Sequence, residues 1–307
     1  MTLQPNATTS RTRENFRRLR IFAVVLTLLA IILFGYFIYS VGVFEIAESV
    51  SRIGIAGFGL LLLIYLLRIC VRASAWQLSV YEPYELKFKD TFQAVIIGEA
   101  VSSIIPLGIL ASGTSKAVAV SNRIPLVAGL SSVATENLFY TFITSLFIIS
   151  GAVLFLFSLP AGDSWVWSVY VLIALIIALL LFVFLILLRQ WHLISGLCDL
   201  IYDLGFFRRT LENGRLHVRL FENIIFNFYR RYPSRFLPIC IFQVLYHACG
   251  VAEVMFILSR VSDAVPTLYN AFLLESVSRV VTIAFKLIPF AIGVDEMSSQ
   301  FISESLA

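Results

Sequence analysis

Long uncharged runs alternate with short polar and basic segments along this chain of 307 residues. Residues 21–44 and 165–188 contain no charged side chain, and each run exceeds the roughly 20 residues that an α-helix needs to cross a bilayer core. The apolar runs at 53–79, 134–158 and 236–258 are also long enough, although they carry a few polar side chains. The pattern predicts an all-α polytopic membrane protein with about five spanning helices.

Two further apolar segments, 91–113 and 265–293, are interrupted by a proline that glycine and polar residues follow. The first contains Glu-Ala-Val-Ser-Ser-Ile-Ile-Pro106, and the second contains Glu-Ser-Val-Ser-Arg ahead of Pro289. Paired, interrupted segments in the two halves of a membrane protein are the best sequence pointer to a transport site. Backbone groups freed at such a break are tolerated only inside protein or against a water-filled cavity. The alternative is that the similarity between these two short sequences is a coincidence, because both consist of residues that are common in this chain.

The basic side chains indicate which ends of the helices face the cytoplasm, where Lys and Arg collect in the loops of membrane proteins. Residues 1–20 are rich in arginine and form a cytoplasmic tail by this rule. If 91–113 crossed the membrane fully, the many arginines of 189–235 would face outward, against the rule. If segment 91–113 instead turns near its proline and leaves the membrane on the side from which it entered, the basic residues predicted in external loops are only Arg52 and Arg260. The charges therefore predict a re-entrant hairpin at 91–113.

This topology divides the chain into four parts. They are a basic cytoplasmic tail at 1–20, a first membrane half at 21–188, a basic cytoplasmic insert at 189–235 and a second membrane half at 236–307. The two interrupted segments then enter from opposite faces, as in an inverted repeat. Apolar residues recur at helical spacing in the insert, which indicates amphipathic helices on the inner membrane surface; a solvated connector is the alternative. Because the chain stops without a further span or a polar tail, we expect a final helix to be missing.

The sequence lacks the patterns of common enzymes and metal sites. Its four cysteines are scattered and form no C-x-x-C pair, and none of them sits with a histidine at the spacing of a zinc site. Neither a nucleotide-binding glycine loop nor a G-x-S-x-G or H-E-x-x-H motif occurs. With 59% hydrophobic and only 14% charged residues, the chain does not suggest a nucleic-acid partner. We expect a protein of the cell membrane with a cytoplasmic N-terminus, no cofactor, no metal and no enzymatic activity.

Charged side chains within the apolar segments are the candidate site residues, because each costs at least ~2.5–3.5 kcal/mol at the bilayer centre. The residues expected to line a polar cavity are Arg68, Arg72, Glu99, Pro106, Lys116, Glu136, Glu275, Arg279 and Pro289. Arg68 and Arg72 lie four apart on one helix face, so together they suit a lipid phosphate; otherwise they snorkel to the inner interface. Glu275 and Arg279 have the same spacing, and a purely structural ion pair is the alternative there.

The motifs around these residues resemble those of the flippase-like, transmembrane family of lysylphosphatidylglycerol synthases. The first signature of that family reads here Pro-Leu-Gly-Ile-Leu-Ala-Ser-Gly-Thr-Ser-Lys116, with Thr114 where an acid is usual. A Glu-Arg pair reads Glu136-Asn, and the last signature reads Pro289-Phe-Ala-Ile-Gly-Val-Asp-Glu, without the usual glycine pair. The resemblance covers most of the chain and identifies a divergent member of the family.

The resemblance implies transport of a phospholipid or a lipid-linked product between membrane leaflets, through a polar cavity lined by the broken helices. Membrane lipids with an anionic or lipid-linked headgroup are the expected partners. No segment of the chain is long enough for an aminoacyl-transferase domain, so we expect a separate enzyme to synthesise the lipid. The alternative is a non-transporting integral-membrane scaffold for a lipid-modifying enzyme such as a glycosyltransferase. Charge within the membrane favours transport, because a scaffold has no need of it.

Overall fold

The computed structural model describes residues 35–36, 39, 42–104, 108–158, 164–204, 208–261 and 265–285. The regular structure in these ranges is helical, and no strand occurs among them. Four of their helices are long and apolar enough to cross a membrane: Ala47–Leu78, Leu126–Phe157, Val166–Arg189 and Pro233–Val261. The prediction of an all-α polytopic membrane protein is thereby confirmed. The remaining predicted span, 21–44, lies almost wholly outside the described residues.

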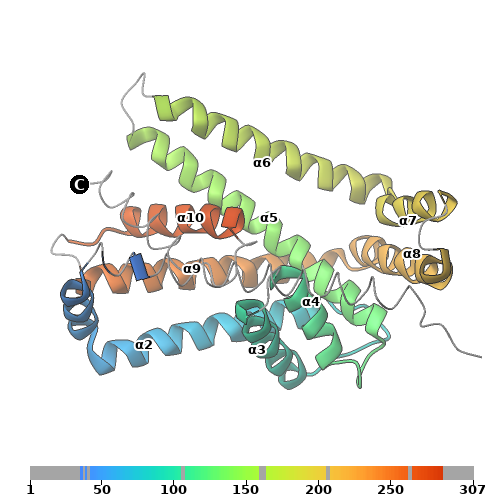
Figure 1. Ribbon diagram of the computed structural model, residues 1–307, viewed down its shortest axis with the longest axis horizontal. Helices are drawn as coiled ribbons and strands as arrows, with labels where there is room; N and C mark the ends of the chain where they lie inside the picture. The colour runs from blue at the N-terminus through green and yellow to red at the C-terminus, as the bar shows by residue number, and fades with distance from the viewer. Residues whose placement is uncertain are drawn as a thin grey trace, which may run out of the picture.

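The central helix of the bundle is α9 (Phe236–Val261), as Figure 1 shows. It lies alongside α2 (Val43–Leu78) and also packs against α5 (Leu126–Ser158) and α10 (Leu268–Phe285). α2 turns sharply at Gly54, whose φ of 65° is a conformation that glycine adopts at little cost. The long straight part of α2 follows this turn and corresponds to the second predicted span.

A helical hairpin occupies the first of the two interrupted segments. α3 (Phe88–Ile104) and α4 (Gly108–Ala119) pack against each other over much of their length. Asp90 near the start of α3 and Arg123 just after α4 approach to 3.8 Å between Oδ1 and Nε. The start of α3 and the end of α4 therefore lie close together, and the two helices run antiparallel. The placement of this hairpin relative to a membrane remains a prediction, and Pro106 lies outside the described residues.

α5 begins at Leu126, well before the predicted start of its span at 134. Its first turns pack between α4 and α8 (Arg208–Arg231), where Ala128 and Val133 are buried. The extra length of this helix therefore serves packing within the protein. Hydrophobic periodicity along a single chain does not distinguish such a buried extension from a longer span.

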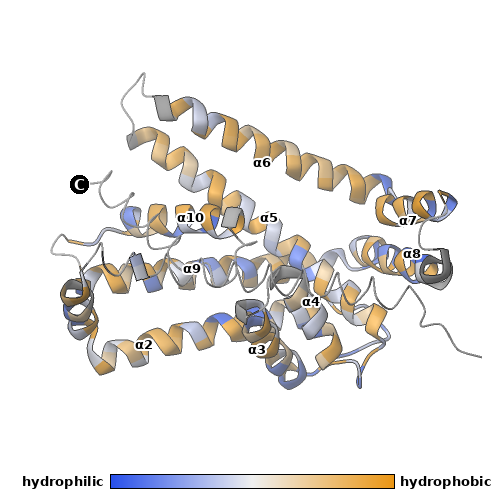
Figure 2. Ribbon diagram, viewed as in Figure 1, coloured by the Kyte–Doolittle hydropathy of each residue, from blue (hydrophilic) through white to orange (hydrophobic). Residues whose placement is uncertain are grey.

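α6 (Ser164–Arg189) stands at the edge of the bundle and packs mainly against α5. Most of its apolar side chains are exposed, and Figure 2 shows hydrophobic residues along nearly its whole length. α7 (Leu193–Asp203) and α8 pack on each other and form the predicted insert, and η1 (Pro233–Arg235) joins α8 to α9. Exposed leucines recur at helical spacing in the insert: Leu193, Leu197, Leu200, Leu204, Leu216 and Leu220. The insert is therefore amphipathic, while its location on a membrane surface remains a prediction.

Candidate functional site

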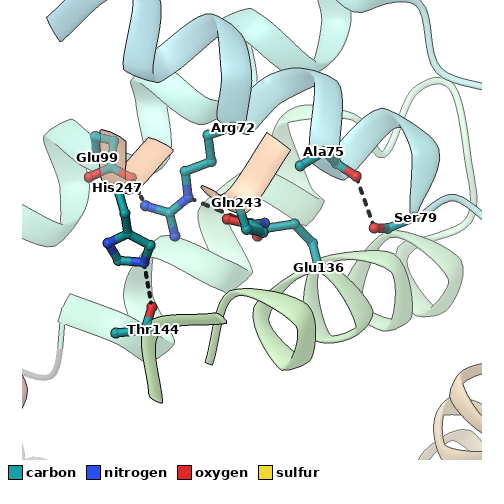
Figure 3. A network of polar contacts seen from close by, with 8 residues as sticks. All are labelled: Arg72, Ala75, Ser79, Glu99, Glu136, Thr144, Gln243 and His247. Atoms are coloured by element: carbon teal, nitrogen blue, oxygen red, sulfur yellow. Dashed lines mark hydrogen bonds and ion pairs between the residues drawn. The ribbon is translucent and has the colours of Figure 1, made fainter. Parts of the chain in front are cut away.

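Arg72 is the centre of a buried polar network, which Figure 3 shows from close by. Its Nη1 donates a hydrogen bond to Glu99 Oε1 of α3 at 2.6 Å, and its Nε lies 3.8 Å from Glu136 Oε1 of α5. The side-chain amide of Gln243, on α9, donates to the same Glu136 oxygen at 2.9 Å. Glu136 is almost completely buried, and a buried charge requires such partners. One arginine thus connects α2, α3 and α5, and through Gln243 also α9.

Arg68 lies one helical turn before Arg72, so both side chains leave the same face of α2. Its Nη1 donates to Glu253 Oε2 of α9 at 2.6 Å, and its guanidinium stacks 4.6 Å from the centre of the Tyr246 ring. The side chain of Arg68 is 11% exposed and that of Arg72 is 16% exposed. The two guanidinium groups therefore turn toward carboxylates of neighbouring helices.

A third ion pair lies on α10, where Arg279 Nη2 is 2.6 Å from Glu275 Oε1. The buried Glu275 carboxylate lies directly against Gly250 of α9. A Cβ atom at that glycine would lie only 2.3 Å from Glu275 Oε1. At Gly151 of α5, a Cβ atom would lie 2.0 Å from the Ser276 hydroxyl oxygen. Glycines of two neighbouring helices therefore allow α10 to approach closely, as small residues do between membrane helices.

An uncharged polar contact connects α5 and α9 beside the ion pairs. His247 Nε2 and the Thr144 hydroxyl lie 3.0 Å apart, and the tautomer of the ring decides which of them donates the hydrogen bond. The imidazole stacks on Phe147, with ring centres 4.7 Å apart, and on Tyr140, at 5.8 Å. His247 and Glu253 contact different partners and form no dyad.

Lys116 of α4 is buried although its side chain carries a charge. Its aliphatic stem packs over Gly98 of α3, where a Cβ atom would lie only 2.7 Å from Lys116 Cγ. This glycine precedes Glu99, so the cationic side chain of α4 and the carboxylate bound to Arg72 belong to the same part of the α3–α4 hairpin.

The structure brings most of the predicted site residues into one region. Arg68, Arg72, Arg279 and Glu99 all interact electrostatically with Tyr246, so charged residues of both interrupted segments lie near the same ring. Pro106 and Pro289 lie outside the described residues, and their predicted proximity stays a prediction. That these residues bind a lipid headgroup is likewise not tested by their positions.

Sequence reasoning missed the contribution of α9. Its polar and small residues recur three or four positions apart and form one stripe along an otherwise apolar helix: Gln243, Tyr246, His247, Gly250 and Glu253. The stripe faces α2, α5 and α10 through the contacts described above. Its helical periodicity was the available signal, because polar residues at this spacing mark one face of a span.

Among the described residues, the charges of the network balance. The cations are Arg68, Arg72, Lys116 and Arg279, and the carboxylates are Glu99, Glu136, Glu253 and Glu275. Within this network, four buried polar atoms nevertheless have no hydrogen-bond partner in the described part of the chain: Arg68 Nε, Arg72 Nε, Gln243 Oε1 and His247 Nδ1. Buried polar groups normally have partners, so the network has capacity for a polar ligand or water.

An apolar cavity of about 710 Å³ borders the network between α5, α9 and α10. Phe147 belongs to both, because it stacks on His247 and also lines the cavity together with Val251, Phe256 and Phe272. A polar region and an apolar cavity are therefore adjacent, as an amphipathic ligand requires.

In the described ranges, no group of three or more His, Cys, Asp or Glu side chains is arranged to hold a metal ion. The sequence model of the family described as Lysylphosphatidylglycerol synthase TM region matches residues 20–306. Comparisons with curated proteins and with solved structures gave no match.

Proposed function

We propose that this chain, which belongs to the lysylphosphatidylglycerol synthase transmembrane-region family, is a lipid transporter. Membership of this family gives it a function related to membrane lipids. The more specific proposal is that it moves a phospholipid or a lipid-linked product between leaflets. The headgroup would pass along the network around Arg72 while the acyl chains stay in an apolar environment.

The observation that carries this proposal is the position of Arg72 between Glu99 and Glu136 inside a membrane bundle. Buried ion pairs seldom stabilise a fold more than apolar residues of the same size would, so a scaffold gains little from three of them. Ionisable residues within membrane segments typically mark the pathways of substrates and ions. The buried charges therefore favour transport over the scaffold alternative.

The contacts suggest how a headgroup enters. A lipid phosphate is chemically similar to the carboxylates that now hold Arg68 and Arg72, because arginine binds either group through paired hydrogen bonds. A lipid phosphate that displaces Glu99 or Glu253 from its arginine would free that carboxylate. The freed carboxylate could then bind an ammonium or hydroxyl group of the same headgroup. The adjoining apolar cavity, lined by Phe147 and Phe272, suits an acyl chain of an anionic or lipid-linked molecule.

The remaining parts of the proposal concern topology and partners. The α3–α4 hairpin is re-entrant from the cytoplasmic side, and the protein lies in the cell membrane with its N-terminus in the cytoplasm. The two interrupted segments form an inverted repeat. A separate enzyme supplies the lipid, so this chain has no catalytic role of its own.

The test is lipid translocation in reconstituted vesicles that contain fluorescent phosphatidylglycerol or phosphatidylethanolamine, with chemical bleaching of the outer leaflet as the readout. We expect Arg72→Gln to lower the translocation rate about tenfold or more, because the headgroup loses the central cation of its proposed path; a factor of ten in rate corresponds to ~1.4 kcal/mol of barrier. Arg52→Gln is the matched control, since Arg52 pairs with Glu48 at 3.0 Å where both side chains are exposed.

Two outcomes would contradict the proposal. One is a wild-type chain that moves neither lipid. The other is a monodisperse Arg72→Gln protein that translocates as fast as the wild type. If that variant does not fold, Glu99→Gln replaces it, because it removes the charge of the bonded partner and keeps its shape.

A further inference from the structure

A second cavity, of about 400 Å³, lies between α5, α6, α7 and α8. Its walls are mainly apolar and include Leu138 of α5, Leu187 of α6 and Phe226 of α8. None of the residues that line it belongs to the Arg72 network or to the apolar cavity beside that network. This cavity is therefore separate from the proposed transport site.

Two polar side chains of α5, Asn137 and Thr141, line this otherwise apolar space. Neither of them forms a hydrogen bond to another residue that the structure describes. Asn137 is half-buried and Thr141 is exposed, so a lipid of the bilayer can reach both. Their amide and hydroxyl groups are neutral and donate hydrogen bonds, and within hydrocarbon such groups require partners. They indicate a ligand with uncharged oxygen acceptors.

Glu222 also lines the cavity, but its carboxylate is already engaged. The backbone N–H of Ile194 donates to Oε1 at 2.8 Å, and the Ser195 hydroxyl donates to Oε2 at 2.6 Å. His192 Nδ1 lies 3.1 Å from Oε2. Glu222 thus binds the first turn of α7 and fixes α7 on α8. Among the described residues that line the cavity, Glu222 is the charged one, and its engaged carboxylate is not available to select a charged headgroup.

The position of the cavity along the bundle corresponds to a membrane interface. Trp191 directly follows the apolar helix α6 and lines the cavity, and tryptophan is enriched where hydrocarbon meets the headgroups. The amphipathic α7–α8 pair lies at the same end, with exposed leucines such as Leu197 and Leu216. Helices of this kind lie in the interfacial plane of a bilayer.

We propose that this cavity binds one resident glycerophospholipid of the leaflet that α7 and α8 face. An acyl chain lies along the apolar wall between α5 and α6, and the Asn137 amide and the Thr141 hydroxyl donate to the ester carbonyls. A lipid is the occupant that combines neutral oxygen acceptors with an apolar tail at this depth. It fills the space where α6, which has few protein contacts, separates from α5. This site does not depend on transport through the Arg72 network.

Trp191 provides a direct readout. The chain has four tryptophans; Trp76 is in the core, and Trp165 and Trp167 are at the opposite end of α6, so subtraction of the Trp191→Phe signal isolates Trp191. The detergent-purified full chain is titrated with phosphatidylcholine brominated in its acyl chains. We expect quenching of Trp191 that saturates at about one lipid per chain. Asn137→Leu should raise the half-saturating concentration about fivefold, which is the value of one net hydrogen bond.

A matched pair of variants separates the cavity from general lipid contact. Ala134→Phe fills the cavity and should abolish the saturable quenching, whereas Ala178→Phe, on an exposed part of α6 outside the lining, should leave it unchanged. Quenching that never saturates, or that survives in Ala134→Phe, would overturn the proposal. A Trp191 signal that changes with protein concentration but not with lipid would assign the surface to a second copy of the chain instead. If Ala134→Phe does not fold, Asn137→Leu and Thr141→Val replace it as the test. A half-saturating lipid concentration that is unchanged in both variants would then overturn the proposal.

Discussion

The interior network around Arg72 and the α7–α8 insert are both rich in charged residues, but their ion pairs differ in exposure and in partners. In the network, Arg72 is buried and interacts with carboxylates from two other helices. In the insert, Arg215 approaches Asp199 only to 3.7 Å, with the side chains 39% and 43% exposed. A buried pair cannot lose one partner without leaving an uncompensated charge, while water replaces the partner of an exposed pair. The same residue types therefore tie helices together in one region and contribute mainly surface charge in the other.

The largest effect is expected from Arg72→Met, which leaves the buried carboxylate of Glu136 and the partly exposed carboxylate of Glu99 without their shared cation. Breaking such a pair costs about 3–5 kcal/mol, so the free energy of unfolding in detergent should fall by that amount. The double variant Arg72→Met/Glu136→Gln should recover part of the loss, because it removes one uncompensated charge. Additive losses in the double variant would show that the two side chains are not coupled.

The next effect concerns Glu222, a carboxylate of the insert that accepts hydrogen bonds from Ile194 and Ser195. Burial raises the pKa of this group, but the hydrogen bonds from Ser195 and Ile194 outweigh burial and hold the pKa below its ordinary value of 4.5. Its stabilising contribution is therefore complete above pH 4.5 and is lost as the pH falls through the lowered pKa.

Glu222→Gln should remove about 1.5–3 kcal/mol of local stability at neutral pH, the range for hydrogen bonds to charged groups. Hydrogen exchange of the first turn of α7 at several pH values measures this, with Glu48→Gln as an exposed control. Exchange in α7 that responds to acid equally in both variants would contradict the assigned role.

A smaller effect is expected where backbones approach closely. Gly250→Ala places a Cβ atom 2.3 Å from Glu275 Oε1 and should cost about 1–3 kcal/mol, as overpacking does. Gly196→Ala in α7 meets no atom within 4 Å and should instead stabilise its helix by about 0.5–1 kcal/mol. Thermal unfolding of the two variants compares them directly, and shifts in the same direction would refute the close packing of α10 on α9.

The smallest effect is expected from Arg215→Gln, because exposed pairs such as Arg215 and Asp199 contribute about 0–1 kcal/mol. Its thermal unfolding should match that of the wild type. A loss comparable to that of Arg72→Met would remove the distinction between the two regions.

Several features of the fold follow from the local pattern of the sequence. The lengths of the apolar runs predict the four described spans, and periodic leucines such as Leu197 and Leu200 predict the amphipathic insert. The Glu275–Arg279 pair follows from its spacing, since residues four apart meet on one helix face. Each of these depends only on neighbours within a few turns of the chain.

The remaining features required the tertiary structure. Arg68 binds Glu253 across 185 residues of sequence and Arg72 binds Glu99 across 27, and no spacing rule predicts which carboxylate meets which arginine. The early start of α5 and the role of His247 likewise depend on the helices that pack beside them. The sequence by itself determined which helices form and which charges enter the membrane region. Only the packing of α2, α3, α5, α9 and α10 decided how those charges are paired, because a buried charge takes its partner from whichever helix lies closest in space.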